Sequence, residues 1–228
     1  MRSIAKLMKD WQFTGPNGVT TAVELPHTWN AKDGQDGGND YWRGCCTYCT
    51  RFAAPVYDPA QQQVWLQFEG VNASAAVLLN GQQLCTHDGG YSTFRAEVTE
   101  LLQAENQLTV RVDNSVNDRV YPQKADFTFY GGIYRDVSLL VVNKNHIALG
   151  HFGDTGVKIT PALQENSADI RVETLVEGSG TVTVELLDAE GRTVAKGEGE
   201  NTFLHLDAPH LWNGVKDPYL YTLSLIHI

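Results

Sequence analysis

Short runs in which apolar and polar residues alternate recur along this chain, and they predict β-strands. In the clearest of them, Leu108, Val110 and Val112 alternate with Thr109 and Arg111. A period of two places the three aliphatic side chains on one face of an extended strand. Further strands are predicted at 64–69, 76–79, 82–85, 137–142, 169–177, 181–187, 192–196 and 219–225.

Turn signals connect several of these runs. Asn80-Gly81 lies between two predicted strands and indicates a tight hairpin, because both turn residues must adopt positive φ. Residues 188–191 predict a second hairpin turn. Helical periodicity is weak, so we expect at most one helical turn in 98–104, and a helical or extended conformation for residues 1–10.

The order of the predicted elements limits the fold class. No stretch alternates strands with helices, which excludes a doubly wound α/β domain and a (β/α)₈ barrel within this chain. Aromatic residues become sparse after Asn143-Lys144-Asn145. We therefore expect an all-β chain that forms two β-sandwiches, at 1–144 and 145–228.

Composition limits the classes of partner that this chain is expected to bind. The 228 residues include 17 Lys and Arg against 27 Asp and Glu, which gives a net charge of −10. An acidic chain without a basic block is a poor binder of nucleic acid. No window approaches 18 consecutive apolar residues, so no membrane contact is expected. Residues 1–10 lack the apolar run of a signal peptide, and we expect a cytoplasmic location.

Four cysteines, three of them within five positions, invite a metal or disulfide interpretation. Neither a repeated Cys-x-x-Cys nor histidines at matching spacing accompany Cys45, Cys46, Cys49 and Cys85. A long chain with so few cysteines is also unlike a disulfide scaffold. We expect reduced, buried thiols, with Cys46 on the opposite strand face from Cys45 and Cys49.

Several segments, taken together and in this order, resemble the N-terminal part of glycoside hydrolase family 2, which includes β-galactosidases, β-glucuronidases and β-mannosidases. They are Leu25-Pro26-His27-Thr28-Trp29-Asn30, Tyr41-Trp42-Arg43-Gly44, Phe68-Glu69-Gly70-Val71, Leu79-Asn80-Gly81, residues 87–94, residues 106–110, residues 126–137, Leu211-Trp212-Asn213-Gly214 and residues 217–221. Each motif is weak alone, but the ordered set covers essentially the whole chain.

The resemblance implies a jelly-roll, galactose-binding-like sandwich followed by an immunoglobulin-like sandwich. In the family a (β/α)₈ barrel with the catalytic glutamates comes next, and we expect this chain to stop before it and before the last strands of the second sandwich. A truncated reading frame or an assembly artefact is the preferred explanation. The implied enzyme is a β-galactosidase-like retaining glycosidase that hydrolyses terminal β-linked sugars, and the isolated chain is expected to be inactive.

The resemblance also implies substrate-binding residues. Asp126 stands six residues before Gly132, where family members carry an aspartate that reaches the barrel mouth. It could bind sugar hydroxyls, or a monovalent or magnesium cation in the full enzyme; alternatively its carboxylate caps its own turn. Asn39 and Asp40 lie in a glycine-rich segment that touches substrate in the family, or else form Asx turns in a solvated loop. No organic cofactor is expected, and a homo-oligomer is implied for the full-length enzyme.

Other polar candidates favour structural roles. An Arg135–Asp136 ion pair is expected to anchor the segment that carries Asp126. His87 and Asp88 are adjacent on an extended segment, so their side chains point to opposite faces and cannot act as a coupled pair.

Aromatic and histidine side chains are expected to pack. The core is the preferred place for Trp29, Trp42 and Trp65, and His27 is expected to be a packed residue. We expect Trp212 to lie under Pro218 and Tyr221. Two other functions stay open: a free-standing carbohydrate-binding module, which needs an exposed platform of two or more aromatic residues, and a structural sandwich without sugar affinity.

Overall fold

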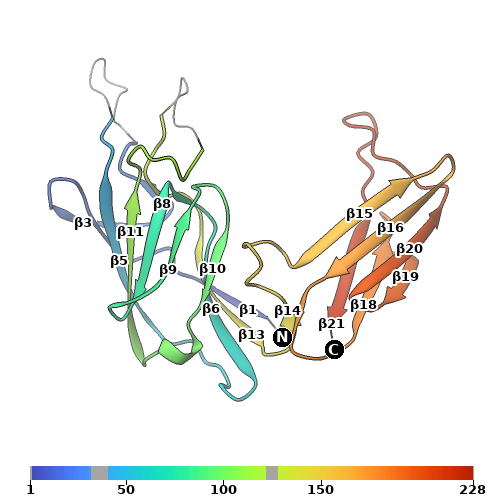
Figure 1. The fold of residues 1–228 in the computed structure, drawn as a ribbon, viewed down its shortest axis with the longest axis horizontal. Coiled ribbons are helices and arrows are strands. Elements are labelled where there is room, and N and C mark those ends of the chain that lie inside the picture. Colours follow the sequence, from blue (N-terminus) through green and yellow to red (C-terminus); the bar gives the residue numbers. More distant parts are fainter. Residues whose placement is uncertain (1, 32–40, 122–127, 228) are drawn as a thin grey trace. The chain divides into compact units, whose positions relative to one another are not determined.

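The computed structural model describes residues 2–31, 41–121 and 128–227, and β-strands dominate it (Figure 1). The predicted all-β class is confirmed. The chain divides into two compact units, Met1–Asn143 (unit 1) and Lys144–Ile228 (unit 2). Within the described ranges, no helix has the length and apolar character needed to span a membrane.

The described residues of unit 1 form three antiparallel sheets. The six-stranded sheet has the order β3 (Thr20–Val23), β2 (Trp11–Thr14), β5 (Cys45–Ala53), β11 (Glu105–Asp113), β8 (Ser74–Leu79), β9 (Gln82–Asp88). The four-stranded sheet has the order β1 (Ser3–Lys6), β13 (Val137–Asn143), β6 (Gln62–Phe68), β10 (Phe94–Glu97). A small sheet joins β4 (His27–Thr28), β12 (Gly132–Ile133) and β7 (Val71–Asn72).

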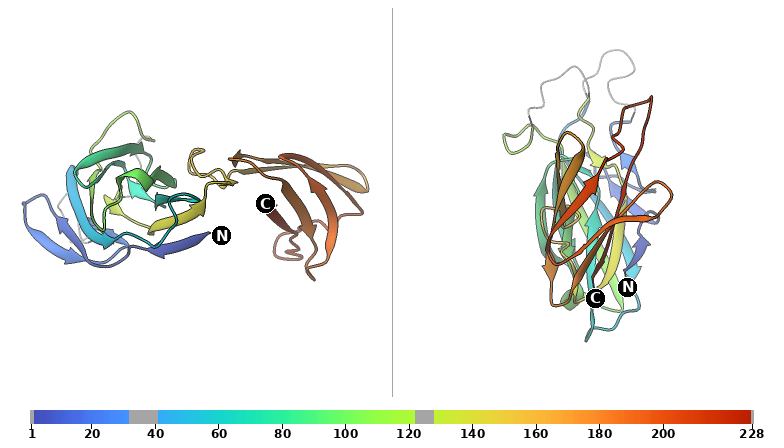
Figure 2. Two further views of the ribbon diagram at one scale, coloured as in Figure 1. Left: turned by 90° about the horizontal axis from the view of Figure 1, so that it is seen from below. Right: turned by 90° about the vertical axis from the view of Figure 1, so that its right-hand side faces the viewer.

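One hydrophobic core lies between the two large sheets of unit 1. Alternate residues of β11, Leu108, Val110 and Val112, are fully buried in it, and so are Val64 and Leu66 of β6. The period of two in the sequence therefore matches the side of each strand that faces the opposite sheet. Figure 2 shows the strands of each unit from two further directions.

The turn predictions agree with the structure. Asn80 and Gly81 have φ values of 52° and 84°, and they connect β8 directly to β9. The single predicted helical turn is the 3₁₀ turn η1 (Thr99–Leu101), and residues 3–6 are extended in β1.

Unit 2 is a sandwich of two three-stranded sheets. Their orders are β15 (Val157–Leu163), β16 (Ser167–Thr174), β20 (Asn201–Asp207), and β19 (Thr193–Glu198), β18 (Val182–Leu187), β21 (Thr222–His227); β14 (His146–Ile147) and β17 (Val176–Glu177) form a separate pair. Alternate residues of β16 and β18 fill the core: Ala168, Ile170, Val172, Val182, Val184 and Leu186.

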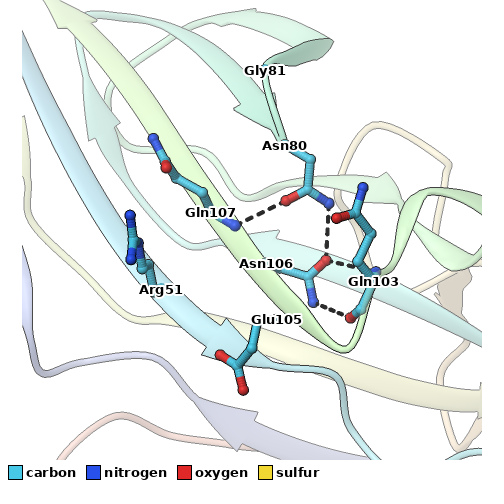
Figure 3. A pocket seen from close by; sticks show the side chains of 7 residues that line it. All are labelled: Arg51, Asn80, Gly81, Gln103, Glu105, Asn106 and Gln107. Atoms are coloured by element: carbon cyan, nitrogen blue, oxygen red, sulfur yellow. Dashed lines mark hydrogen bonds between the residues drawn. The ribbon is translucent and has the colours of Figure 1, made fainter.

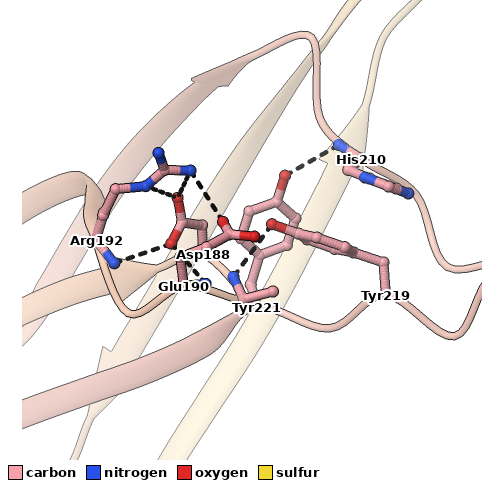
Figure 4. A network of polar contacts seen from close by, with 7 residues as sticks. Asp188, Glu190, Arg192, His210, Tyr219 and Tyr221 are labelled. Atoms are coloured by element: carbon pink, nitrogen blue, oxygen red, sulfur yellow. Dashed lines mark hydrogen bonds and ion pairs between the residues drawn. The ribbon is translucent and has the colours of Figure 1, made fainter.

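The segment before β21 differs from its prediction. The last strand begins at Thr222 rather than at 219, because Tyr219 and Tyr221 are engaged elsewhere (Figure 4). Tyr221 Oη accepts a hydrogen bond from the backbone N–H of His210, and the Tyr219 ring stacks on the His210 ring at 4.0 Å. Trp212 is 64% exposed, so the expectation that it packs under its neighbours is wrong.

A carboxylate with several donors closes the β18–β19 hairpin (Figure 4). Asp188 is 8% exposed and accepts hydrogen bonds from the backbone N–H groups of Arg192 and Glu190 and from the Arg192 guanidinium. The backbone N–H of Arg192, followed by its guanidinium, holds the pKa of Asp188 below its usual value. The ionised carboxylate therefore stabilises the folded hairpin.

We predict a pH-dependent effect of Asp188→Asn on the melting temperature of unit 2. Because the folded pKa is depressed, the stabilisation is complete above the unfolded pKa of about 3.9 and is lost as the pH falls through the folded pKa. Thermal melts should show a large difference between the two proteins at neutral pH and none in acid. Glu190→Gln, at a 63% exposed side chain, is the control and should change little. A difference that stays constant with pH would contradict the assignment.

The thiols only partly follow their prediction. All four cysteines are free, and β5 places Cys46 in the core, on the face opposite Cys45 and Cys49. Burial raises the pKa of Cys46 to about 12. Cys45, however, is exposed at the start of β5, so the expectation of burial is wrong for this residue.

Candidate binding site

The three substrate-binding residues predicted from sequence lie outside the described residues. Asn39 and Asp40 fall in 32–40, and Asp126 falls in 122–127. The structure does describe the residues on either side of both segments, and these residues define a candidate binding site at one end of unit 1.

The C-terminal flanks of the two segments meet. The backbone N–H of Phe129 donates to Tyr41 Oη at 3.3 Å. Arg43 donates to the same hydroxyl, and its guanidinium lies 4.7 Å from the Tyr41 ring centroid and 5.6 Å from that of Phe129. A cation over two aromatic faces joins them further. The residues that follow the two segments in the sequence, Tyr41, Arg43 and Phe129, are therefore in contact, and they form what we call the base of the candidate site.

Two fully buried asparagines hold this base to the sandwich. Asn30 Oδ1 accepts the backbone N–H of Gly131 at 2.7 Å, and its Nδ2 donates to the Trp42 carbonyl at 2.9 Å. Asn114, next to β11, donates to Asn30 Oδ1 and to the Phe129 carbonyl, and it accepts the backbone N–H of Gly44. Side-chain amides can pair with both donors and acceptors, so they replace the ladder bonds that irregular buried backbone lacks.

A third buried asparagine, Asn72, forms hydrogen bonds with three tyrosine residues. Asn72 Nδ2 donates to the Tyr130 carbonyl at 2.6 Å and to Tyr134 Oη at 3.2 Å, and its Oδ1 accepts from Tyr121 Oη at 2.8 Å. Burial raises the pKa values of the Tyr121 and Tyr134 hydroxyls. These phenols stay protonated at neutral pH, and they serve as donors and acceptors rather than as bases.

Glycines bring the backbone of this base into close contact with side chains. A Cβ atom on Gly131 would lie 1.9 Å from Trp29 Cζ2, and one on Gly90 would lie 2.1 Å from Asn72 Oδ1. Only glycine, which has no Cβ atom, allows the backbone to lie this close to the neighbouring side chains. The pair 131–132 in the sequence motif is therefore explained by packing against β4 and Trp29.

A shallow pocket of about 450 Å³ opens beside this network. Thr28, Ala31, Tyr91, Tyr130 and Tyr134 line it. The Tyr91 ring is stacked with those of Tyr121, at a centroid distance of 5.7 Å, and Tyr134, at 6.1 Å. Tyr91 is also 50% exposed, so part of its ring is accessible from solvent.

The pocket is adjacent in the chain to both predicted substrate-binding segments. Ala31 directly precedes residues 32–40, and Tyr121 directly precedes residues 122–127. The sequence analysis missed these tyrosines, because they come from three separate segments and only the fold brings them together.

The Arg135–Asp136 prediction needs a correction. Asp136 Oδ2 is 2.5 Å from Lys6 Nζ, so this carboxylate pairs with β1. The Arg135 stem lies beside Gly70, and its Nη1 donates to the Tyr91 carbonyl at 3.3 Å. Arg135 is thus attached to the tyrosine pocket rather than to the adjacent aspartate. Sequence adjacency was misleading because β13 pairs with β1, and Asp136, which directly precedes β13, therefore lies beside Lys6.

The histidine predictions are confirmed. His87 stacks on Phe94 at 4.3 Å and its Nε2 lies 3.0 Å from Ser92 Oγ, whereas Asp88 bonds to Ser74 and Arg119. The two side chains thus have separate partners.

His27 Nδ1 lies 2.7 Å from Tyr48 Oη, and burial lowers the pKa of His27. Its ring packs against those of Phe13 and Tyr48, as expected for a packed residue.

The tryptophans near the site pack as expected. Trp65 is 8% exposed, and Trp29 and Trp42 pack against the core with their ring centroids 6.0 Å apart. Among residues 2–31, 41–121 and 128–227, no group of three or more His, Cys, Asp or Glu side chains could hold a metal ion.

A second hollow, of about 590 Å³, lies at the opposite end of β8 and β11 (Figure 3). The side chains of its two asparagines are bonded to each other and to backbone. Asn80 Nδ2 donates to Asn106 Oδ1 at 3.0 Å, Asn80 Oδ1 accepts the Gln107 N–H, and Asn106 is bonded to both backbone groups of Gln103. These contacts hold the β8–β9 turn against β11, which is a structural role.

Comparison with known proteins identifies the two units. Residues 38–162 match the model of the glycosyl hydrolase 2 galactose-binding domain-like family, and residues 151–226 match that of glycosyl hydrolases family 2. A β-glucuronidase from Bacteroides fragilis is 33% identical over 96% of this chain, which corresponds to 34% of that protein. A β-galactosidase from Thermoanaerobacter pseudethanolicus is 29% identical over 72% of this chain and 23% of its own length.

A solved structure gives the same result. The crystal structure of an FMN-binding β-glucuronidase from Facaelibacterium prausnitzii L2-6 superimposes with a TM-score of 0.93 and 34% identity, over 100% of this chain and 37% of that one. The chain spans about a third of the length of these curated and solved relatives. Since the first family model alone matches more than half of the residues, this chain belongs to glycoside hydrolase family 2.

Proposed function

We propose that this chain is the non-catalytic N-terminal portion of a retaining β-glycosidase that hydrolyses terminal β-linked sugars. The proposal rests on the match of both family models, one after the other along the chain. The chain also spans about a third of the length of a relative that is named a β-glucuronidase. The proposed catalytic carboxylates belong to a barrel beyond these residues.

Unit 1 would supply part of the substrate pocket. In the proposed enzyme, Asp126 accepts hydrogen bonds from sugar hydroxyls, and Asn39 and Asp40 do the same from the second segment. The shared base supports this role, because buried asparagines fix the backbone from which both segments leave.

The carboxylates described near the site support a non-catalytic role. Retention requires two carboxyl groups about 5–5.5 Å apart, one as nucleophile and one as acid and base. Asp88 is bonded to Ser74 and Arg119, Asp136 is paired with Lys6, and Glu69 accepts from Gln67. Each is engaged in holding the fold.

The proposed substrate is a β-glucuronide or a β-galactoside. Relatives with each name align with this chain: a β-glucuronidase is 33% identical, and a putative β-galactosidase of solved structure is 34% identical. The two substrates differ at C6, where a glucuronide carries a carboxylate, so matched aryl glycosides separate them.

We predict that the purified chain does not hydrolyse aryl β-glucuronides or β-galactosides above a buffer control. A chimera in which it replaces the aligned region of the Bacteroides fragilis β-glucuronidase should hydrolyse one of them. Hydrolysis by the isolated chain would overturn the non-catalytic assignment, and a folded but inactive chimera would count against the glycosidase proposal.

Asp126→Asn in the chimera tests the pocket-wall role. A lost charged hydrogen bond is worth about 1.5–3 kcal/mol, so kcat/KM should fall roughly 10- to 100-fold. Asp118→Asn, at an exposed residue of the same chain region, is the matched control and should leave kcat/KM unchanged. Equal effects of both substitutions would contradict the role of Asp126.

Three further properties belong to the proposed full-length enzyme: a cytoplasmic location, a homo-oligomeric state, and function without an organic cofactor, with a monovalent or magnesium cation near Asp126. Titration of the active chimera with sodium, potassium and magnesium checks the cation. If kcat/KM stays the same at every cation concentration, the proposal of a cation near Asp126 is wrong. Because one relative is described as FMN-binding, the same chimera is titrated with FMN, and no binding is expected.

The second candidate is a carbohydrate-binding module, which the exposed tyrosine pocket favours. Sugar binding by the isolated chain together with an inactive chimera would select it.

A further inference from the structure

We propose that the tyrosine pocket of unit 1 is itself a saccharide-binding subsite, which takes one pyranose ring of the glycoside against Tyr91. The proposal rests on the proposed function and adds a binding surface formed by this chain alone. Its lining comes from Thr28, Ala31, Tyr91, Tyr130 and Tyr134.

The chemistry of the lining fits a sugar ring. Pyranoses present C–H groups on one face and hydroxyls around the rim, so an aromatic face flanked by hydrogen-bonding groups is complementary to them. Tyr91 is 50% exposed and has a stacked neighbour, Tyr134, which also lines the pocket. The volume of about 450 Å³ lies within the range of about 300–1,000 Å³ that small-molecule sites occupy.

The pocket is preformed. Asn72 holds Tyr134 through its hydroxyl and Tyr130 through its carbonyl, and Arg135 donates to the Tyr91 carbonyl. Gly90 approaches Asn72 so closely that the backbone before Tyr91 is fixed as well. A rigid platform loses little conformational entropy on binding, which favours even a small ligand.

The position of the pocket also suits a substrate. Ala31 and Tyr121 directly precede the segments that carry the proposed pocket-wall residues, and Tyr121 stacks on Tyr91. The second hollow of unit 1 differs, because its two asparagine side chains are bonded to each other and its lining residues include no aromatic side chain.

Saturation-transfer NMR on the purified 228-residue chain tests the subsite. The probes are methyl β-glucuronide, methyl β-galactoside and the disaccharide lactose, each at millimolar concentration. We expect transfer to ring protons of at least one probe, loss of at least three quarters of it in Tyr91→Ala, and retention in Tyr91→Phe, which keeps the ring. Phe203→Ala removes a 72% exposed aromatic residue from unit 2 and should have no effect.

Two outcomes of the NMR experiment on the isolated chain overturn the proposal. One is the absence of transfer from every probe to the folded wild-type chain. The other is equal transfer in wild type and a folded Tyr91→Ala variant, with folding judged from the dispersion of the amide spectrum. In the active chimera, Tyr91→Ala should raise KM at least fivefold with kcat nearly unchanged.

The failure of this subsite and the failure of the proposed function are distinguishable. An active chimera that is insensitive to Tyr91→Ala removes the subsite and leaves the glycosidase. An inactive chimera with Tyr91-dependent sugar binding by the chain removes the glycosidase and leaves the subsite.

Discussion

Gly131→Ala should destabilise unit 1 by about 3 kcal/mol or more, which is a large fraction of the stability of a domain. The new Cβ would lie 1.9 Å from Trp29 Cζ2. Trp29 cannot move aside easily, because its ring is stacked with Phe13 at 6.0 Å and packed edge-on against Trp42 at 6.0 Å. Either the indole leaves the core or the backbone of 129–132 shifts away from Asn30.

Urea unfolding followed by tryptophan fluorescence measures this change. Gly81→Ala is the matched control, since its φ is +84° and nothing lies within 4 Å of the added Cβ. It carries only the backbone penalty of a left-handed residue, about 1–2 kcal/mol. Similar losses of stability in the two variants would show that the contact between Gly131 and Trp29 is unimportant.

Asn30→Ala is expected to cost about 3–5 kcal/mol of unfolding free energy. The substitution removes the bonds that Asn30 makes to the Gly131 N–H, the Trp42 carbonyl and one Asn114 amide hydrogen; the bonds to Gly131 and Asn114 are buried, and the bond to Trp42 is partly buried. Each buried polar group that loses its hydrogen bond costs about 1–3 kcal/mol. The loss should be concentrated at the base of the candidate site.

Hydrogen exchange of the Gly131 amide reports on this local effect, and urea unfolding reports on the global one. The control is Asn17→Ala, where an exposed asparagine accepts a single bond from the Val19 N–H in a surface turn. It should cost less than about 1 kcal/mol. If the Gly131 amide exchanges faster in Asn30→Ala but not in Asn17→Ala, the result supports the role of the asparagine network. Equal exchange of this amide in the two variants would contradict that role.

Local patterns predicted the strands well because the relevant physics is local. The alternation at 107–113 follows from burial of one strand face, and β11 buries the residues that the pattern selected. The Asn80-Gly81 turn follows from backbone sterics alone, and its φ values agree. The sequence was a poorer guide at Trp212, where contacts of neighbouring tyrosines with His210 decide the orientation of the segment.

The candidate site was predictable only in part. The family motifs predicted that Asn39, Asp40 and Asp126 bind substrate. Because these residues lie outside the described part of the chain, their roles stay predictions. The exposure of Cys45 and the Lys6 partner of Asp136 depend on which strands are neighbours, which no local pattern specifies.

By itself the sequence determined the all-β class, the hairpins and membership of a glycosidase family, since strand periodicity, turn sterics and ordered motifs are encoded over a few neighbouring residues. Only the tertiary structure decided that Asn30, Asn72 and Asn114 form the buried base of one site and that Tyr91 stacks with Tyr121 and Tyr134. The physical reason is that these buried amides and stacked rings pair residues that are 30 to 84 positions apart in the sequence, and strand topology brings such residues into contact.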